Sequence, residues 1–545
     1  MEKIKKNFFD RPNLIIMLFI VFISLRLFVS SSTVFLESDH SRFLAVASSF
    51  PHHTLSNEQL YIGHPPFYPY VIYFFTLIVS QDYIAGIVIS LLASALTFFI
   101  LYRLFMILTN NFFITYLVLV FFTLSVELII TSNSVLRWSF QMLLISSTIY
   151  FYLKGVKYND KKTLVISAII GALAGITSDH SLFLLPTFIL ICLIFRSGIP
   201  KIERLSWKYV AIPFVIVALF FGMWTFTKAY TYSINDYYPA GLDGAPVYTR
   251  DFRLIHVLNQ HYFEDYEPYQ FAGDRQRKGF TFRARDYIYR LGYMFNLVPF
   301  TIPRGINFTT MEYLLFPKHI TYMILLYLPL TLFALLGFVF AIINHNKTNL
   351  FLLGLFLIFI FPVTQVVSTP TYILFANVIF FYFISYGIFN LFRKYRKYII
   401  IILAIGLLIL IPFWVYSHPN LVLLNKGMVA SQNTGDYINN NIPKDKAIMV
   451  QSGYNLRLNY LTENRMLGLP PKSKDLMKLI DFYDVDYVIY GRYYTWDRAF
   501  YSLDTVDYIR SNQDKFKLIA TIQEDYGNIK KPISTDEMYI YEVTR

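Results

Sequence analysis

The stretch Glu37-Ser38-Asp39-His40-Ser41-Arg42-Phe43 follows the first long hydrophobic run of the chain, Leu14–Val29. That run is long enough to cross a bilayer together with its flanks, since roughly 20 apolar residues span the hydrocarbon core. Basic residues precede it, as in a signal peptide, but the serine-rich segment after it is a weak cleavage site. We therefore expect an uncleaved first span, and a cluster of charged side chains at the membrane surface where the chain leaves it.

The composition is that of an integral membrane protein. Of the 545 residues, 55% are hydrophobic and 15% are charged, whereas soluble domains average nearer a quarter charged. The net charge of +13 raises the alternative of nucleic-acid binding, but the basic residues lie mostly in short loops beside hydrophobic runs, which is the pattern that orients membrane proteins. We therefore expect a lipid bilayer around the chain and no nucleic-acid partner. The single cysteine, Cys192, excludes intrachain disulfides and thiolate metal clusters.

Hydrophobic runs of about span length recur along the first three quarters of the chain. They lie near residues 13–31, 83–105, 112–131, 134–153, 162–178, 181–196, 208–228, 319–343, 349–367, 370–391 and 398–415. The apolar segment 66–80 decides the topology, because it changes the parity of every later span. If it does not cross and the N-terminus is cytoplasmic, every short basic loop falls inside, as the positive-inside rule asks. We therefore expect about eleven spans, with 66–80 as an amphipathic or re-entrant helix in the outer leaflet.

This topology divides the chain into two domains. Residues 1–415 form a polytopic α-helical membrane domain with external loops at 32–82 and 229–318, and residues 416–545 form a soluble extracytoplasmic domain. The second domain alternates helix and strand patterns, which predicts a small α/β fold with a mainly parallel sheet. Its expected helices lie near 427–440, 473–483 and 505–514, and its strands near 447–450, 486–490, 518–522 and 538–543. It has no Gly-rich phosphate loop, so nucleotide binding is not expected there.

Asp39 stands at the predicted lipid–water boundary. It is either a solvated loop residue or a general base that removes a proton from an acceptor hydroxyl or amine, which requires a carboxylate within hydrogen-bond reach of the acceptor. His40 could share that work or be structural. Arg42 lies three residues on, close enough to hold Asp39 if the segment is helical.

A second polar segment, Gly63-His64-Pro65-Pro66-Phe67-Tyr68-Pro69, lies in the same predicted external loop. Proline favours the first turn of a helix, so His64 would lie at the N-terminal end, which attracts anions. We interpret His64 as a candidate phosphate ligand, with a structural cap as the alternative. Tyr68 is a further candidate for substrate binding.

Two short predicted external turns complete the rim of this site. The first, around Ser132–Arg137, contributes Arg137, and the second, Thr177–His180, contributes Asp179 and His180 as candidate substrate-binding residues. Charges at such positions are costly in lipid, so they usually face a cavity or each other. No spacing of His and Asp is diagnostic of a metal site. We assign no metal ligand and no cofactor, and a divalent cation stays an open alternative.

The order of these features resembles that of the GT-C membrane glycosyltransferases, notably the dolichyl-phosphate-mannose protein mannosyltransferases and the aminoarabinose transferases of lipid A. The first external loop of those families reads D-E-x-x-Y/F-A, and this chain has Asp39-His40-Ser41-Arg42-Phe43-Leu44. His64-Pro65-Pro66 is similar to their second motif, and Gly171–Thr177 with Leu185-Pro186 is similar to a third block. In this chain His40 replaces the usual Glu, and Ser178 replaces the Lys of the third block.

The resemblance implies an enzyme of the plasma membrane, a multi-pass hexosyl- or pentosyltransferase that takes a sugar from a polyprenyl-phosphate donor at the outer face. The sugar would pass with inversion to a protein, lipid or glycan acceptor, with Asp39 as base. His64 and arginines such as Arg137 would stabilise the leaving phosphate. A transporter or flippase of lipid-linked saccharides is the main alternative, although such proteins usually show paired repeats, which this sequence lacks. A lipid-bound scaffold without chemistry is the third.

Overall fold

The computed structural model describes residues 11–32, 43–44, 47, 67–196, 206–234, 328–360, 374–393, 395, 433–450, 458, 461–469, 473–491, 503–523 and 537–544. The predicted span 398–415, most of the first external loop and the loop 229–318 lie outside these residues or almost entirely so. Of Glu127, Asp179 and His180 only the backbone is described.

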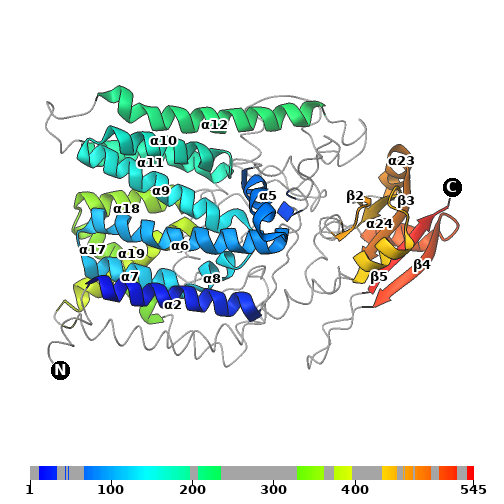
Figure 1. Ribbon diagram of the computed structural model, residues 1–545, viewed down its shortest axis with the longest axis horizontal. Helices are drawn as coiled ribbons and strands as arrows, with labels where there is room; N and C mark the ends of the chain where they lie inside the picture. The colour runs from blue at the N-terminus through cyan, green and yellow to red at the C-terminus, as the bar shows by residue number, and fades with distance from the viewer. Residues whose placement is uncertain are drawn as a thin grey trace.

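The first part of the chain is a bundle of helices that lie side by side (Figure 1). Its helices are α2 (Arg11–Ser32), α6 (Asp82–Thr109), α7 (Phe112–Leu124), α8 (Val126–Ser132), α9 (Arg137–Tyr158), α10 (Lys161–Gly175), α11 (Leu184–Phe195), α12 (Trp207–Ile234), α17 (Leu328–Ile343), α18 (Lys347–Ile360) and α19 (Leu374–Leu391). Among the described residues, three helices are long and apolar enough to cross a membrane: α2, α6 and α19. Several of the others are shorter apolar helices, which agrees with a polytopic helical fold.

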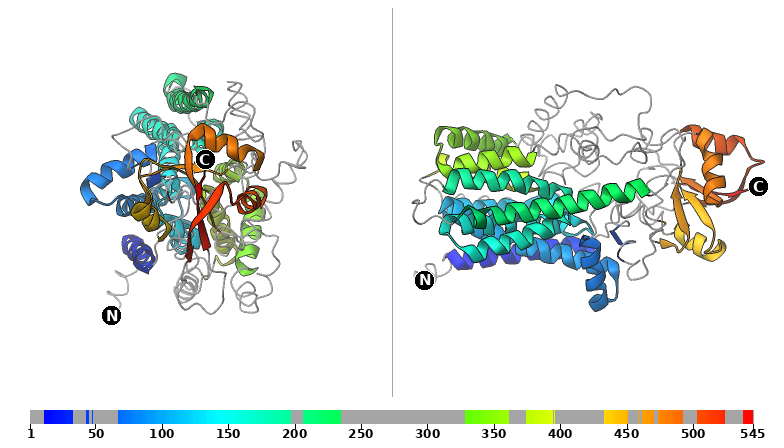
Figure 2. Two further views of the ribbon diagram at one scale, coloured as in Figure 1. Left: turned by 90° about the vertical axis from the view of Figure 1, so that its right-hand side faces the viewer. Right: turned by 90° about the horizontal axis from the view of Figure 1, so that it is seen from above.

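The apolar segment 66–80 forms a helix, α5 (Phe67–Val79). It is turned across the end of the bundle instead of running along it, in both views (Figures 1 and 2). One side is buried through Tyr68 and Ile72. The other exposes Phe74, Leu77 and Ile78. A helix in this segment is thus confirmed, but its exposed side is apolar like its buried side, so its amphipathic character is not confirmed. Its re-entrant course and its place in the outer leaflet stay predictions.

The predicted hydrophobic run 112–131 forms two helices, because the helix is interrupted at Ser125. Ser125 has extended backbone, with ψ of 117°, so α7 ends at Leu124 and α8 begins at Val126. The guanidinium of Arg26 from α2 donates to the carbonyl oxygens of Phe122 (3.5 Å) and Thr123 (3.2 Å). These carbonyls belong to the last turn of α7. Because the helix ends there, they lack the backbone N–H donors that a continuing helix would supply. The fully buried Arg26 therefore caps the interruption.

The helices α17 and α19 cross at close range because each has a glycine at the contact. A Cβ atom on Gly337 would overlap the carbonyl oxygen of Phe383, and one on Gly387 would overlap the carbonyl oxygen of Phe333. Small residues allow helix backbones to approach in this way within membranes. The ring of Phe338 stacks on Phe383 beside this crossing, with ring centroids 3.9 Å apart.

The C-terminal part contains a five-stranded sheet in the order β2-β1-β3-β5-β4. Its strands are β1 (Ala447–Val450), β2 (Arg465–Gly468), β3 (Val485–Gly491), β4 (Phe516–Gln523) and β5 (Glu537–Val543), and its helices include α23 (Ser473–Tyr483) and α24 (Leu503–Ser511). A further helix covers residues 433–441. The predicted elements are confirmed within a few residues at their described ends. Strand β2 was not predicted, because its sequence Arg465-Met466-Leu467-Gly468 lacks the continuous apolar run of β1.

The expectation of a mainly parallel sheet holds for one half only. Strand β1 is parallel to β2 and to β3, but β5 is antiparallel to both β3 and β4. The strands β4 and β5 are neighbours both in the chain and in the sheet, an arrangement that antiparallel pairing allows without a crossover connection. One face of the sheet buries Leu476, Leu479 and Ile509 of α23 and α24.

Candidate functional site

The start of α5 lies against the end of α10. Phe67, the residue directly after His64-Pro65-Pro66, donates its backbone N–H to the carbonyl oxygen of Ile176 at 3.3 Å. Ile176 follows α10 and precedes the short helix η2 (Asp179–Phe183). The second predicted motif and the predicted turn Thr177–His180 therefore meet at one end of the bundle.

Tyr68 joins this start of α5 to two further segments. Its hydroxyl lies 3.3 Å from Oγ of Ser90 on α6, and Ser90 donates to the carbonyl oxygen of Ser134 at 2.7 Å. Ser134 belongs to the turn between α8 and α9, the first of the two turns predicted for the rim. Tyr68 is fully buried, and burial raises the pKa of its phenol, so the side chain is neutral and holds helices together. Its predicted contact with substrate stays a prediction.

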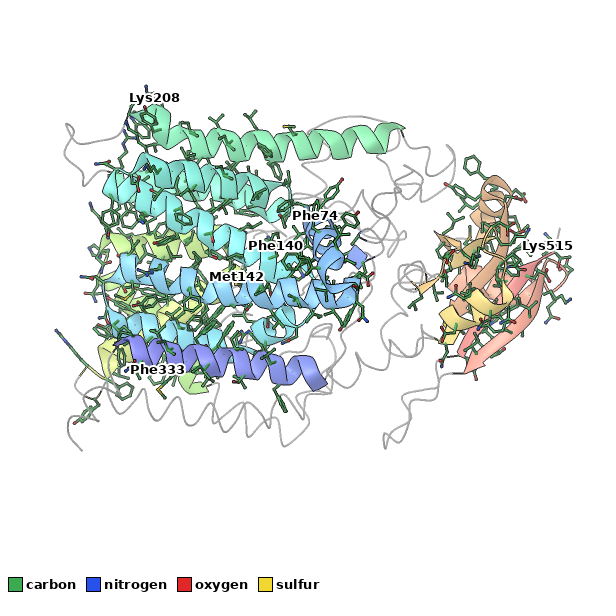
Figure 3. The ribbon with its side chains drawn as sticks, in the orientation of Figure 1. Phe74, Phe140, Met142, Lys208, Phe333 and Lys515 are labelled. Atoms are coloured by element: carbon green, nitrogen blue, oxygen red, sulfur yellow. The ribbon has the colours of Figure 1, made fainter. Side chains whose placement is uncertain are left out.

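Four aromatic rings surround this junction: Phe43, Phe67, Tyr68 and Phe140, here called the aromatic cluster. The ring of Phe43 meets Tyr68 edge-on at 5.3 Å between centroids. Phe140 of α9 lies 5.9 Å from both Phe67 and Tyr68, and Figure 3 shows it at the end of α9 beside α5. The cluster thus connects the chain just after the Asp39 stretch to the chain just after His64.

Arg137 is the first residue of α9 and is only 4% exposed. Its guanidinium carbon lies 5.2 Å from the centroid of the Trp138 ring. The N-terminal end of a helix carries a partial positive charge, and a buried guanidinium adds to it. This end of α9, beside the aromatic cluster, is therefore favourable for an anion.

The remaining predicted site residues are placed only in part. Asp179 and His180 lie in η2, next to the Phe67–Ile176 contact, with their backbone alone described. The candidates Asp39, His40, Arg42 and His64 lie outside the described residues. Within the described residues, no group of three or more His, Cys, Asp or Glu side chains could hold a metal ion, and the open alternative of a divalent cation is not tested by this.

Sequence reasoning missed several polar residues at the same end of the bundle. Ser90 is a fully buried residue that connects Tyr68 to the α8–α9 turn. Asn133 and Gln141, on either side of Arg137 in the chain, are buried at 1% and 5% exposure. The sequence does show these amide and hydroxyl side chains within apolar runs. It does not show toward which part of the bundle each side chain points.

A comparison with known protein families finds a match that covers the candidate site. Residues 63–224 match the family of dolichyl-phosphate-mannose-protein mannosyltransferases. This segment begins one residue before His64 and contains α5, the α8–α9 turn, Arg137 and η2. No curated protein sequence matches the chain.

Solved structures share the fold at low sequence identity. ArnT from Cupriavidus metallidurans in the apo state has a TM-score of 0.55 and 11% identity, over 96% of this chain and 97% of that chain. ArnT from the same organism bound to undecaprenyl phosphate gives 0.54, with the same identity and coverage. The archaeal oligosaccharyltransferase AglB from Archaeoglobus fulgidus, in complex with an inhibitory peptide and a dolichol-phosphate, gives 0.52 at 9% identity, over 89% of this chain and 69% of that chain. The chain therefore resembles the GT-C glycosyltransferases, as its motifs predict.

Proposed function

From this GT-C fold, we propose that the chain is a glycosyltransferase that moves a sugar from a polyprenyl-phosphate donor to an acceptor at the outer face of the membrane. Two solved relatives support the donor class, because ArnT was solved with undecaprenyl phosphate and AglB with a dolichol-phosphate. The matched mannosyltransferase family supports sugar transfer.

The observation that carries the proposal is the junction of three segments at one end of the bundle. Phe43 contacts Tyr68, and Phe67 donates to Ile176. Phe43 and Phe67 are the described residues that come directly after the Asp39 and His64 motifs in the chain. Both lie in the aromatic cluster at the end of the bundle that carries Arg137, which supports the proposal that the two motifs act there.

The proposed reaction is a single displacement. Asp39 accepts the proton of an acceptor hydroxyl or amine, whose oxygen or nitrogen attacks the anomeric carbon of the sugar. The bond from that carbon to the phosphate oxygen breaks, and the polyprenyl phosphate leaves with the electron pair, so the configuration inverts. His64 and Arg137, with the N-terminal end of α9, stabilise the charge that grows on the leaving phosphate. His40, Arg42, Asp179 and His180 would complete the binding surface.

The test is a transfer assay on the purified full-length protein in lipid nanodiscs. It is incubated with a panel of undecaprenyl-phosphate sugars and with peptide, lipid and glycan acceptors, and mass spectrometry identifies the acceptor that gains mass. Transfer from one donor, with inversion seen by NMR of the new glycosidic bond, supports the proposal. Transport of a lipid-linked saccharide between leaflets without any transfer would favour the flippase alternative instead.

A further inference from the structure

Two buried carboxamides beside Arg137 have oxygen atoms without a hydrogen-bond partner. These are Oε1 of Gln141 and Oδ1 of Asn133, which lack a partner within the described part of the structure. The residues are 5% and 1% exposed. Buried polar atoms are hydrogen-bonded in the great majority of cases, and an exception calls for an explanation such as a ligand or a bound water.

The face of α9 that carries Gln141 is turned toward α10 and α11. Gln141, Thr148 and Tyr152 share this face, because residues seven and eleven apart lie on one side of a helix. A Cβ atom on Gly171 of α10 would lie 3.3 Å from Cγ2 of Thr148. The ring of Tyr152 lies 4.3 Å from that of Phe188 on α11.

The register between α9 and α10 places Gln141 along this face. The two helices run antiparallel, with Gly155 against Leu164 and Thr148 against Gly171. Continued toward the start of α9, this register pairs Leu144 with Gly175, the last residue of α10, so Gln141 lies level with the segment that follows α10. Gln141 therefore lies at the end of the bundle where Phe67 meets Ile176, one helical turn deeper than Arg137 on the same side of α9.

Asn133 lies in the α8–α9 turn at the same end. Its Nδ2 donates to the carbonyl oxygen of Ile129 at 2.8 Å, which fixes the orientation of the amide and leaves the oxygen as the unpartnered atom. The next residue, Ser134, accepts the hydrogen bond from Ser90 that connects to Tyr68. Asn133 and Gln141 thus flank Arg137 in the chain, and both belong to segments that meet α5 or η2.

The chemistry of these two atoms distinguishes between the parts of a polyprenyl-phosphate sugar. A carboxamide oxygen accepts hydrogen bonds, so it suits a group with hydrogen to donate. An ionised phosphodiester has none, and the guanidinium of Arg137 serves that group better. Sugar hydroxyl groups, and the amino group of an amino sugar, are donors.

We infer that Gln141 and Asn133 bind hydroxyl or amino groups of the sugar that the lipid donor carries, and that Arg137 beside them serves the phosphate. This inference rests on the proposed function and adds the residues that select the sugar. In the absence of the sugar the two oxygens are left unsatisfied. Replacement of Gln141 by an apolar group of similar shape then leaves the ligand-free protein as stable as before, or more stable. Replacement of Asn133 also removes the hydrogen bond from its Nδ2 to Ile129, so it lowers the stability.

The test compares two lipids on the same full-length protein in nanodiscs. Native mass spectrometry measures the affinity for undecaprenyl phosphate alone and for the undecaprenyl-phosphate sugar that the wild type binds best. The variants are Gln141→Met, Gln141→Leu and Asn133→Leu. The matched control is Asn377→Leu in α19. It removes a fully buried carboxamide whose oxygen and nitrogen also lack partners among the described residues, but this carboxamide lies outside the proposed site.

We expect each test variant to lower the affinity for the sugar-bearing lipid about tenfold, which corresponds to one lost hydrogen bond in a buried site. The affinity for undecaprenyl phosphate alone should change less than about twofold. Asn377→Leu should change neither affinity, and neither Gln141 variant should lower the ligand-free melting temperature, whereas Asn133→Leu lowers it through the lost hydrogen bond to Ile129. Equal weakening of both lipids, or none, overturns the inference while the proposed function stands. A wild type that binds neither lipid overturns both.

Discussion

The ring of Phe43 meets the ring of Tyr68 edge-on, with centroids 5.3 Å apart and planes at 89°. Phe43 closes the stretch that contains Asp39, and Tyr68 lies on the helix that begins just after His64. Both rings are buried. This contact joins two separate parts of the first predicted external loop, so it is a structural condition for the proposed site.

The Phe43–Tyr68 contact should be measurable as a coupling energy. Phe43→Leu, Tyr68→Leu and the double variant form a mutant cycle, and we expect a coupling of about 0.5–1.5 kcal/mol, the usual value of an aromatic pair beyond its buried area. Unfolding of the full-length protein in denaturant gives the three free-energy differences. Strictly additive effects of the two substitutions would show that the rings do not interact.

The cap that Arg26 forms over the interrupted helix is a second point for substitution. Arg26→Met leaves the carbonyl oxygens of Phe122 and Thr123 without their donor, and we expect it to lower the free energy of unfolding by about 1–3 kcal/mol. Arg26→Lys keeps a charged donor, the ammonium group, and should lower the free energy of unfolding by less. Hydrogen exchange should rise in α8 for Arg26→Met first. An Arg26→Met protein with unchanged stability and exchange would contradict the capping role.

The glycine crossing between α17 and α19 should tolerate no added methyl group. In Gly337→Ala or Gly387→Ala the new Cβ would overlap a backbone carbonyl, which cannot move as a side chain can, so we expect a loss of about 1–3 kcal/mol or more. Gly222→Ala in α12 is the control, because nothing lies within 4 Å of its added Cβ. Thermal unfolding in detergent measures all three. If Gly222→Ala were destabilised and Gly337→Ala were not, the claim that the α17–α19 crossing requires glycine would be contradicted.

How much of this could be predicted differs between the elements. Pro65-Pro66 predicted the start of α5 to within one residue, because proline favours a first helical turn. The interruption at Ser125 was not predicted, because it depends on Arg26, which lies far from it in sequence. The direction of β5 depends on which strand it pairs with, and no local pattern contains that choice. The unpartnered oxygens of Asn133 and Gln141 follow from how helices pack, so they appear only in the structure.

The topology that underlies the site can be tested by labelling. In a Cys192→Ser background, Lys162→Cys, in the first turn of α10, tests the end of the bundle predicted to be cytoplasmic, and Lys444→Cys tests the C-terminal domain. Lys162 is exposed, and the side chain of Lys444 is 64% exposed. A membrane-impermeant maleimide applied to intact cells should label Lys444→Cys only, and permeabilisation should add Lys162→Cys. The opposite pattern would contradict this topology and, with a cytoplasmic N-terminus, would mean that α5 crosses the membrane.

The most direct test of the central claim is Asp39→Asn, measured for donor binding and for turnover on the same full-length protein. A general base contributes about 10²–10⁴-fold to the rate, so we predict that sugar transfer falls by at least about a hundredfold. Binding of the polyprenyl-phosphate sugar should stay within about twofold, since an uncharged amide keeps the shape of the side chain. A variant that transfers sugar at the rate of the wild type would contradict the assignment of Asp39 as the base.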